Sequence, residues 1–293
     1  MVTIQVNNLV KCFGKFTALD GVNLEVNQGE VFGFIGPNGA GKTTTIRCLL
    51  GILQATSGSV QMLGMDAWKD AVEIHKKIAY VPGDVNLWSN LTGGEVMDLF
   101  IKLKGHHDVK RKNELIEMFD LDPSKKCRTY SKGNRQKVAL IAALASDADV
   151  FILDEPTSGL DPLMENVFQS CIRELKEQKK TVLLSSHILS EVEELCDRVA
   201  IIRQGKIIDT GTLNDLRHLT AMNMQIDTRL PITDLSTLTG VEIVSQVEGR
   251  ANLKVDADQV GAVLKHAAEY DILHLINTPP NLEDLFMSHY KQS

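Results

Sequence analysis

The residues best suited to chemistry form a glycine-rich stretch, Gly36-Pro-Asn-Gly-Ala-Gly41-Lys42-Thr43, between an apolar run and a helix start. Its spacing fits G-x-x-x-x-G-K-[ST], a phosphate-binding loop, in the strand-to-helix context that this motif requires. Glycines let backbone N–H groups converge on phosphate oxygens at a helix N-terminus, where the helix dipole favours negative charge. We expect Lys42 to reach the β- and γ-phosphates of a nucleotide and the Thr43 hydroxyl to bind Mg²⁺. The alternative, a chance glycine-rich turn, explains fewer of these features.

A pair of carboxylates follows a second apolar run. Val150-Phe-Ile-Leu153 is typical of a strand buried on both faces, and it ends in Asp154-Glu155. Carboxylates at the carboxyl end of a parallel strand lie in the ligand crevice of an α/β sheet. Asp154 suits Mg²⁺, through water, and Glu155 suits a base that orients the attacking water. Such a pair is usually a solvated turn, but the phosphate loop upstream reverses that expectation.

Residues 1 to about 215 resemble the ATP-binding subunits of ABC transporters. The most specific element is Tyr130-Ser131-Lys132-Gly133-Asn134-Arg135-Gln136, which resembles the family's L-S-G-G-Q signature and stands twenty residues before Asp154. Three further segments resemble the family's D-loop, its switch-histidine region and its adenine-stacking aromatic. They are Ser158-Gly-Leu-Asp161, Ser185-Ser-His187 and Lys11-Cys-Phe13-Gly14.

The resemblance implies an α/β fold: a P-loop NTPase core with an antiparallel β subdomain and a helical subdomain at about residues 84–146. It also implies a site shared by two subunits, in which the signature of one faces the γ-phosphate held by the other. The residues then expected to contact ATP are Phe13, Gly36, Pro37, Asn38, Gly39, Ala40, Gly41, Lys42, Thr43, Thr44, Ser131, Gly133 and Asp161. Thr43 and Asp154 are expected to hold Mg²⁺, and Glu155 and His187 to act in catalysis.

Three of these residues have simpler explanations when taken alone. Ser131 could be a plain helix cap, and a lone histidine such as His187 is often a surface or capping residue. Phe13 could belong to the core together with Phe16, whereas stacking on a base contributes roughly 1–3 kcal/mol. The family usually has Tyr at the position of Phe13, and Phe keeps the π-face.

The chain departs from the family pattern at two positions. Lys132 stands where the signature usually has Gly, so a cation either approaches the phosphate or points to solvent. Gly83, in Tyr80-Val-Pro-Gly83-Asp84, stands where the family has a Gln that touches Mg²⁺ and the water, on a loop that receives the membrane subunit. Either a neighbour such as Asp84 or Asn86 replaces that contact, or the loop serves only the membrane partner.

The elements that must position these residues can be read from periodicity. Strands are expected at 4–6, 22–26, 31–35, 150–153, 181–185 and 199–202, a helix from Lys42 to Leu50, and mostly helix over 93–146, with Asp108 as a cap. One face of a further helix carries Val167, Phe168, Cys171, Ile172 and Leu175.

Composition changes after about Met222. The last 72 residues hold ten acids and five bases, and therefore −5 of the net charge of −7. We expect an ATP-binding domain over 1–220 and a small accessory α+β domain over 221–293. The latter should contain a helix at about 258–269, a strand at 272–276, and a final helix after Pro279-Pro280 capped by Asn281.

Composition also limits the class of protein. The acidic net charge of −7 argues against nucleic acid as the main partner. The longest apolar run, Val138 to Ala145, has eight residues, whereas a span needs about 18. Five scattered cysteines, at 12, 48, 127, 171 and 196, fit reduced thiols better than a disulfide framework or a zinc site. The N-terminus lacks the pattern of a secretory signal.

The sequence thus predicts an ATP-hydrolysing subunit that works as a homodimer or heterodimer on the inner face of the cell membrane. It would drive transport, with export favoured over import, through a separate integral membrane permease. Two other classes remain: a nucleic-acid-directed ATPase with a similar head, and a small-molecule kinase, which shares only the phosphate loop. The sequence does not identify the transported substrate.

Overall fold

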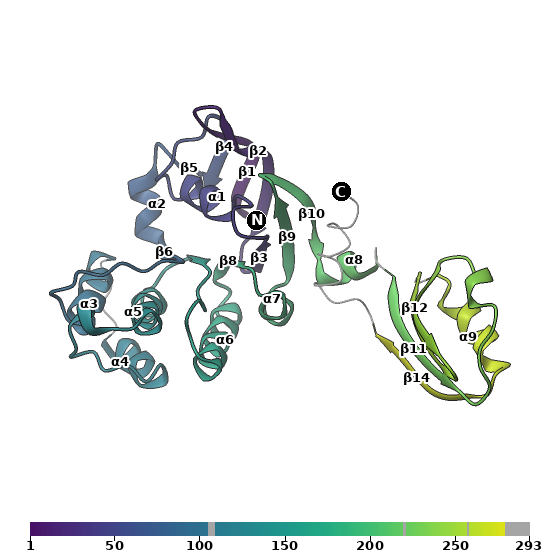
Figure 1. The fold of residues 1–293 in the computed structure, drawn as a ribbon. Helices are drawn as coiled ribbons and strands as arrows, with labels where there is room; N and C mark the ends of the chain where they lie inside the picture. The colour runs from purple at the N-terminus through teal and green to yellow at the C-terminus, as the bar shows by residue number, and fades with distance from the viewer. Residues whose placement is uncertain (105–108, 219–220, 257, 279–293) are drawn as a thin grey trace. The chain divides into compact units, whose positions relative to one another are not determined.

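The computed structural model describes residues 1–104, 109–218, 221–256 and 258–278. The chain divides into two compact units, Met1–Thr210 and Gly211–Ser293 (Figure 1). This division precedes the boundary expected after residue 220. Across the described ranges, no helix is long and apolar enough to cross a membrane.

A six-stranded sheet forms the centre of the first unit, with the strand order β10-β9-β3-β8-β7-β6. The pairs β9/β3, β3/β8, β8/β7 and β7/β6 are parallel. The strands are β3 (Val31–Ile35), β6 (Ile78–Val81), β7 (Val150–Asp154), β8 (Thr181–Ser186), β9 (Arg198–Arg203) and β10 (Lys206–Thr212). Every residue of β3, β7 and β8 is buried, as continuous apolar runs predict for central strands. Their carboxyl ends therefore meet at one edge, where the glycine-rich loop and the acid pair begin.

Helices pack against this sheet. They are α1 (Lys42–Leu49), α2 (Ala71–Lys77), α6 (Pro162–Glu177) and α7 (Leu189–Leu195). Helix α6 begins where Asp161 accepts a hydrogen bond from the Met164 N–H and Pro162 occupies the first turn. It buries the face that periodicity predicted, including Phe168, Cys171 and Ile172.

A second, antiparallel sheet covers α1, with the order β2-β1-β4-β5. Its strands are β1 (Val2–Phe13), β2 (Phe16–Asn27), β4 (Ser57–Met62) and β5 (Met65–Asp66). Ile4 and Leu24 from this sheet share one apolar cluster with Ile46 of α1 and Phe32 of β3. The β1–β2 hairpin pairs Phe13 with Phe16 at its closed end, so both rings are carried at the tip.

A helical lobe lies between β6 and β7 in sequence (Figure 1). It contains α3 (Gly93–Leu103), α4 (Val109–Met118), a short 3₁₀ turn (Cys127–Thr129) and α5 (Lys132–Leu144). Thr92 and Glu95 form a reciprocal capping box at the start of α3, and α5 packs against α3 and α4. The fold is the predicted P-loop NTPase fold with its antiparallel β and helical subdomains. The predicted cap at Asp108 lies outside the described residues.

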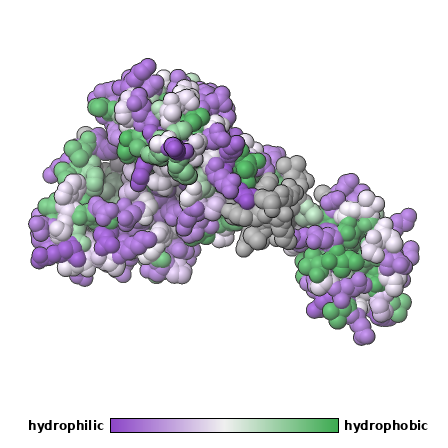
Figure 2. Space-filling view, turned by 45° about the horizontal axis from the view of Figure 1, so that its top comes forward, coloured by the Kyte–Doolittle hydropathy of each residue, from purple (hydrophilic) through white to green (hydrophobic). Residues whose placement is uncertain are grey.

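The second unit has its own core. A four-stranded antiparallel sheet, in the order β12-β13-β11-β14, encloses Ile226, Leu253 and Val263, the last from α9. The elements are α8 (Leu213–His218), β11 (Met222–Thr228), a 3₁₀ turn (Leu235–Thr237), β12 (Val241–Val247), β13 (Arg250–Val255), α9 (Val260–Ala268) and β14 (Ile272–Thr278). The expected Pro279-Pro280 break and the helix after Asn281 lie outside the described residues. Figure 2 shows apolar patches among polar residues on this unit's surface.

Candidate functional site

The glycine-rich loop leaves β3 and enters α1 at the carboxyl edge of the central sheet. Gly41 has φ 115°, a left-handed conformation that a residue without Cβ adopts readily, directly before the first helical residue, Lys42. The Lys42 side chain is 5% exposed, and its ammonium group donates to the Gly36 carbonyl at 2.6 Å. The loop thus turns a charged donor and a helix N-terminus toward one place, which suits an anion.

A cavity of about 320 Å³ opens over this loop. Its lining includes Phe13, Phe16, Ala18, Pro37, Asn38, Gly39, Gly41, Lys42, Thr43, Thr44 and Glu155. Seven of the predicted nucleotide contacts in the loop and its helix therefore border one space, together with Phe13. Gly36 and Ala40 are buried beneath it.

Two aromatic rings flank the cavity on the β1–β2 hairpin. Phe13 is 47% exposed and Phe16 67%, so neither is a core residue. The Lys11 ammonium lies 5.1 Å from the centre of the Phe13 ring, which gives the ring a cationic neighbour. The sequence left open whether Phe13 belongs to the core together with Phe16. The hairpin register instead brings both rings to the opening of the cavity.

Asp154 is held by two hydroxyl groups. The Thr43 hydroxyl donates to Asp154 Oδ2 at 2.9 Å, and the Ser185 hydroxyl donates to Oδ1 at 2.9 Å. Burial raises the pKa of Asp154, and these two hydrogen bonds oppose the rise. Thr43 and Asp154 together offer hard oxygen donors of the kind that Mg²⁺ prefers. Within the described ranges no cluster of three or more His, Cys, Asp or Glu could hold a metal.

Glu155 lies between two other predicted site residues, Lys42 and His187. Its Oε1 is 3.4 Å from Lys42 Nζ, and its Oε2 is 3.4 Å from His187 Nδ1. Its backbone has φ 48°, in the left-handed region, and its N–H donates to the Ser185 carbonyl at 2.9 Å. The structure therefore brings the predicted base, the phosphate-loop lysine and the switch histidine together.

The signature segment, residues 130–136, lies elsewhere. Ser131 caps α5 by accepting from the Asn134 N–H at 3.2 Å, and Tyr130 is anchored through its hydroxyl on the Asp122 carbonyl at 2.6 Å. Neither Ser131 nor Gly133 borders the cavity over the phosphate loop. Asp161 is likewise engaged as the cap of α6. One chain alone does not assemble all the predicted contacts.

Gly83 follows β6 and lies beside the acid pair. A Cβ placed on it would stand 3.2 Å from the Asp154 carbonyl and 3.7 Å from Glu155 Cβ. Asp84 is exposed, and its carboxylate accepts a long hydrogen bond, 3.5 Å, from the Asn86 amide. The loop is therefore adjacent to the acid pair, and neither candidate side chain, Asp84 or Asn86, borders the cavity over the phosphate loop.

Sequence reasoning missed Glu191. It is 6% exposed; its Oε2 accepts from the Ser186 hydroxyl at 2.7 Å, and its Oε1 has no hydrogen-bond partner among the described residues. Burial raises the pKa of Glu191, and the hydroxyl groups of Ser186 and Thr157 partly oppose this rise. Ser186 immediately precedes His187, so Glu191 supports the turn that carries the histidine. The sequence did contain a signal for this burial, because Glu191 shares one face of its helix with the apolar residues Val192 and Leu195.

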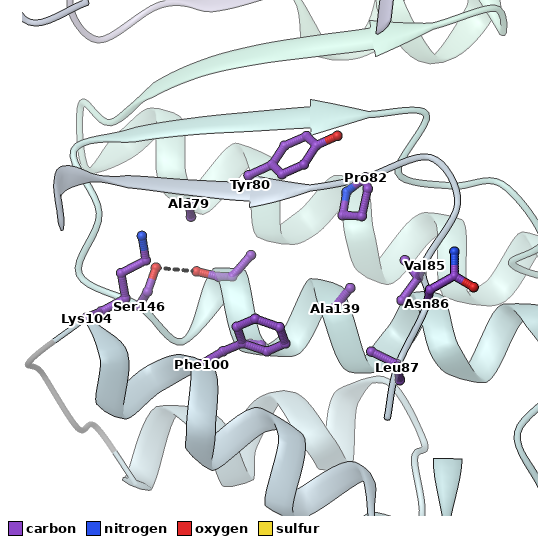
Figure 3. A pocket seen from close by; sticks show the side chains of 12 residues that line it. Ala79, Tyr80, Pro82, Val85, Asn86, Leu87, Phe100, Lys104, Ala139 and Ser146 are labelled. Carbon is purple, nitrogen blue, oxygen red and sulfur yellow. Dashed lines mark hydrogen bonds between the residues drawn. The ribbon is translucent and has the colours of Figure 1, made fainter. Parts of the chain in front are cut away.

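A separate apolar pocket of about 120 Å³ lies in the helical lobe, between β6, the Gly83 loop and helices α3 and α5 (Figure 3). Phe100 borders it and packs against Trp88, with ring centres 5.9 Å apart. Other lining residues are Ala79, Tyr80, Pro82, Val85, Asn86, Leu87, Lys104, Ala139, Ala142, Ala143 and Ser146. Trp88 is 54% exposed, so this region presents aromatic surface to solvent.

Comparison with known proteins gives consistent matches. A family model described as ABC transporter matches residues 19–158. A bacitracin transport ATP-binding protein of Bacillus licheniformis is 38% identical, over 73% of this chain and 71% of that protein. A linearmycin resistance ATP-binding protein of Bacillus subtilis is 32% identical over 97% of both.

Solved structures agree. The structure of an ATP-binding subunit of an ABC transporter superposes with a TM-score of 0.70 at 31% identity, covering 74% of this chain and 92% of that one. A dimeric cassette in a post-hydrolysis state, bound to ADP and Pi, gives 0.66 at 26% identity, covering 72% and 98%.

Proposed function

The chain belongs to the ATP-binding subunits of ABC transporters and is an ATPase, and we propose that it drives export of a substrate through a separate membrane-spanning subunit. The observation that carries the catalytic part is the position of Glu155, between Lys42 and His187 at the edge of the cavity. Glu155 orients the attacking water and accepts its proton as the γ-phosphoryl group is transferred in line.

The other site residues have separate tasks. Lys42 holds the β- and γ-phosphates. Its ammonium group then moves away from Glu155, and the carboxylate is free to face water. His187 donates to the γ-phosphate from the end of β8. Thr43 and Asp154 would hold Mg²⁺, which would offset the charge of the phosphates. Phe13, with Phe16 beside it, stacks on the adenine.

We further propose that two subunits complete each site. Ser131 and Gly133 lie away from their own cavity, so they would face the nucleotide of a partner subunit. The dimeric, ADP-bound cassette similar to this chain supports that arrangement. The two subunits can be identical or different.

The helical lobe offers a surface for the membrane partner. The apolar pocket beside Phe100 and the loop at Gly83 lie together, and the loop also touches the acid pair. A segment of the membrane subunit seated there would sense the catalytic edge through Gly83. We therefore propose that the protein works on the cytoplasmic face of a membrane, attached through its partner.

Export is favoured by the relative that is named for linearmycin resistance and aligns over 97% of both chains. An importer is the alternative.

The test is reconstitution of the protein and its co-purified membrane subunit in liposomes, with the ATPase facing outward and ATP supplied outside. An exporter accumulates substrate inside the vesicle, whereas an importer empties it. Glu155→Gln is the control without turnover.

A further inference from the structure

The first turn of α5 contacts the segment that follows the acid pair, residues 156–159, within the same chain. The Lys132 ammonium donates to the Ser158 hydroxyl at 2.7 Å. The buried Gln136 amide donates to the Pro156 carbonyl at 3.0 Å. Lys132 and Gln136 lie one helical turn apart, so the first two turns of α5 are hydrogen-bonded to two points of this segment.

The backbones also approach closely at this junction. A Cβ on Gly133 would lie 2.4 Å from the Gly159 carbonyl oxygen, so any side chain at Gly133 would push the segments apart. Gly159 has φ 85°, and a Cβ built on it would lie 3.4–3.5 Å from the Lys132 stem. Lys132 therefore packs its methylene groups over Gly159 while its charged end binds Ser158.

The structure gives Lys132 a contact within its own chain that neither expectation included. The side chain is exposed, and an isolated surface contact of a lysine contributes little. Here, however, the hydrogen bond, the packed stem and the close backbone approach act on the same two segments. The signature segment and residues 156–159 are thus joined, and the latter continue directly from Glu155.

We propose that Lys132 is a positioning residue that makes the signature segment and the segment after Glu155 move as one body during the ATPase cycle. The proposal rests on the two-subunit site of the proposed function. When the signature closes on the partner's nucleotide, the Lys132–Ser158 contact carries that motion to the subunit's own Glu155. Lys132 does not border its own cavity, so it should affect turnover rather than the binding of ATP to the isolated subunit.

The test is a double-mutant cycle with Lys132→Met, Ser158→Ala and both together. Met keeps most of the stem and removes the donor. Each single variant should lower kcat about three- to tenfold, and the double variant should lose no more than either single one, because the two groups form one contact. KM for ATP and nucleotide binding by the monomer should stay unchanged. Lys132→Arg, which keeps a donor, should recover part of the rate, and Lys110→Met on α4 is the matched surface control.

Two results would overturn the proposal. A normal kcat for Lys132→Met would show that the contact is passive. A low kcat for Lys132→Met with a normal Ser158→Ala would show that Lys132 acts elsewhere, such as on the phosphate of the partner's site. Failure of the two-subunit site is a distinct outcome, since Glu155→Gln would then stay monomeric with Mg-ATP whatever the Lys132 variants do.

Discussion

Glu155 is the residue on which the charges of the site converge. It contacts an ammonium on one side and an imidazole on the other, and its backbone adopts a left-handed conformation that non-glycine residues rarely take. A residue held in such a conformation is fixed by its surroundings, here by β8 through Ser185. The fold therefore fixes the backbone that carries the carboxylate.

Replacing this carboxylate should separate ATP binding from turnover. Glu155→Gln keeps the size and a hydrogen-bonding group but removes the base, so ATP should still bind while kcat falls about 10²–10⁴-fold. Because ATP then persists between subunits, the variant should be dimeric in Mg-ATP by size-exclusion chromatography. Lys42→Ala should instead lose nucleotide affinity and stay monomeric. A monomeric Glu155→Gln at saturating ATP would contradict the shared site.

Glu191 predicts a pH dependence of stability. Burial raises its pKa above the ordinary 4.5, so the folded state holds this proton more tightly than the unfolded state. That contribution is fully present below the unfolded pKa and is lost as pH rises through the higher folded pKa. The stability of Glu191→Gln relative to the parent should therefore increase from pH 4 to pH 7.

Urea denaturation midpoints at several pH values measure this difference. Glu117→Gln, an exposed change on α4, controls for replacing a carboxylate by an amide. A Glu191→Gln difference that is the same at every pH would show that the carboxyl group is not stabilised in its protonated form by the fold.

The sequence predicts features that depend on neighbouring residues better than those that depend on packing. The loop from Gly36 to Thr43 consists of eight consecutive residues, so its place between β3 and α1 could be predicted from the sequence. The contact of Lys132 joins residues 26 apart in the chain, and it depends on how α5 meets the segment after β7. Glu191 was not singled out from the sequence, and it is buried because α7 turns this face inward.

At the scale of elements, the loop after β6 links two surfaces. Gly83 lies against the acid pair, while its neighbours Pro82, Val85 and Asn86 border the apolar pocket of the helical lobe (Figure 3). The φ of Gly83 lies outside the left-handed region, so the backbone itself admits other residues. A side chain there must displace the Asp154 carbonyl contact by only a few tenths of an ångström.

Two variants test what this loop does. If Asp84 replaces the family's Gln near Mg²⁺, Asp84→Ala should lower the ATPase rate strongly and change ATP affinity little, because hard cations prefer oxygen ligands. Gly83→Gln should then keep or raise the rate. If the loop serves only the membrane partner, both variants should hydrolyse ATP normally in isolation and fail in transport.

The structure favours the second outcome. Asp84 is exposed and bonded to Asn86, and it does not border the cavity over the phosphate loop. Steady-state ATPase rates of the two purified variants distinguish the two outcomes. A strongly reduced rate for Asp84→Ala would contradict the interpretation that the loop serves only the membrane partner.

At the scale of the whole molecule, the two units have separate apolar cores. The first is built around β3 and α1, and the second around β11, β13 and α9. The change in composition near Met222 indicated a second unit, although the division lies after Thr210. The order of its short strands could not be predicted, because their pairing joins residues far apart in the sequence. The edge strands β12 and β14 expose apolar residues, including Val244, Val247 and Leu273.

Removal of residues 222–293 should leave a folded ATP-binding core. Every predicted site residue precedes the deletion, and Leu216 of α8, which is buried, is retained. Nucleotide affinity should stay within about threefold of the intact chain, a difference of less than 1 kcal/mol. Fluorescent-nucleotide titration measures this, with the intact chain as reference and Lys42→Ala in the truncated chain as the control for specific binding.

The deletion also tests what the second unit does. Within the described part of the chain, β12 and β14 are the edge strands of this sheet, and they expose apolar side chains. Natural sheets usually protect such edges, so we expect an interface with another subunit. If the unit stabilises the dimer, Glu155→Gln lacking residues 222–293 should need more Mg-ATP to dimerise than the full-length Glu155→Gln protein, by size-exclusion chromatography at matched concentrations. If both proteins dimerise at the same Mg-ATP concentration, the second unit does not stabilise the dimer, and regulation remains as its role. A truncated protein that aggregates and binds no ATP would instead show that the unit only covers apolar surface of the core.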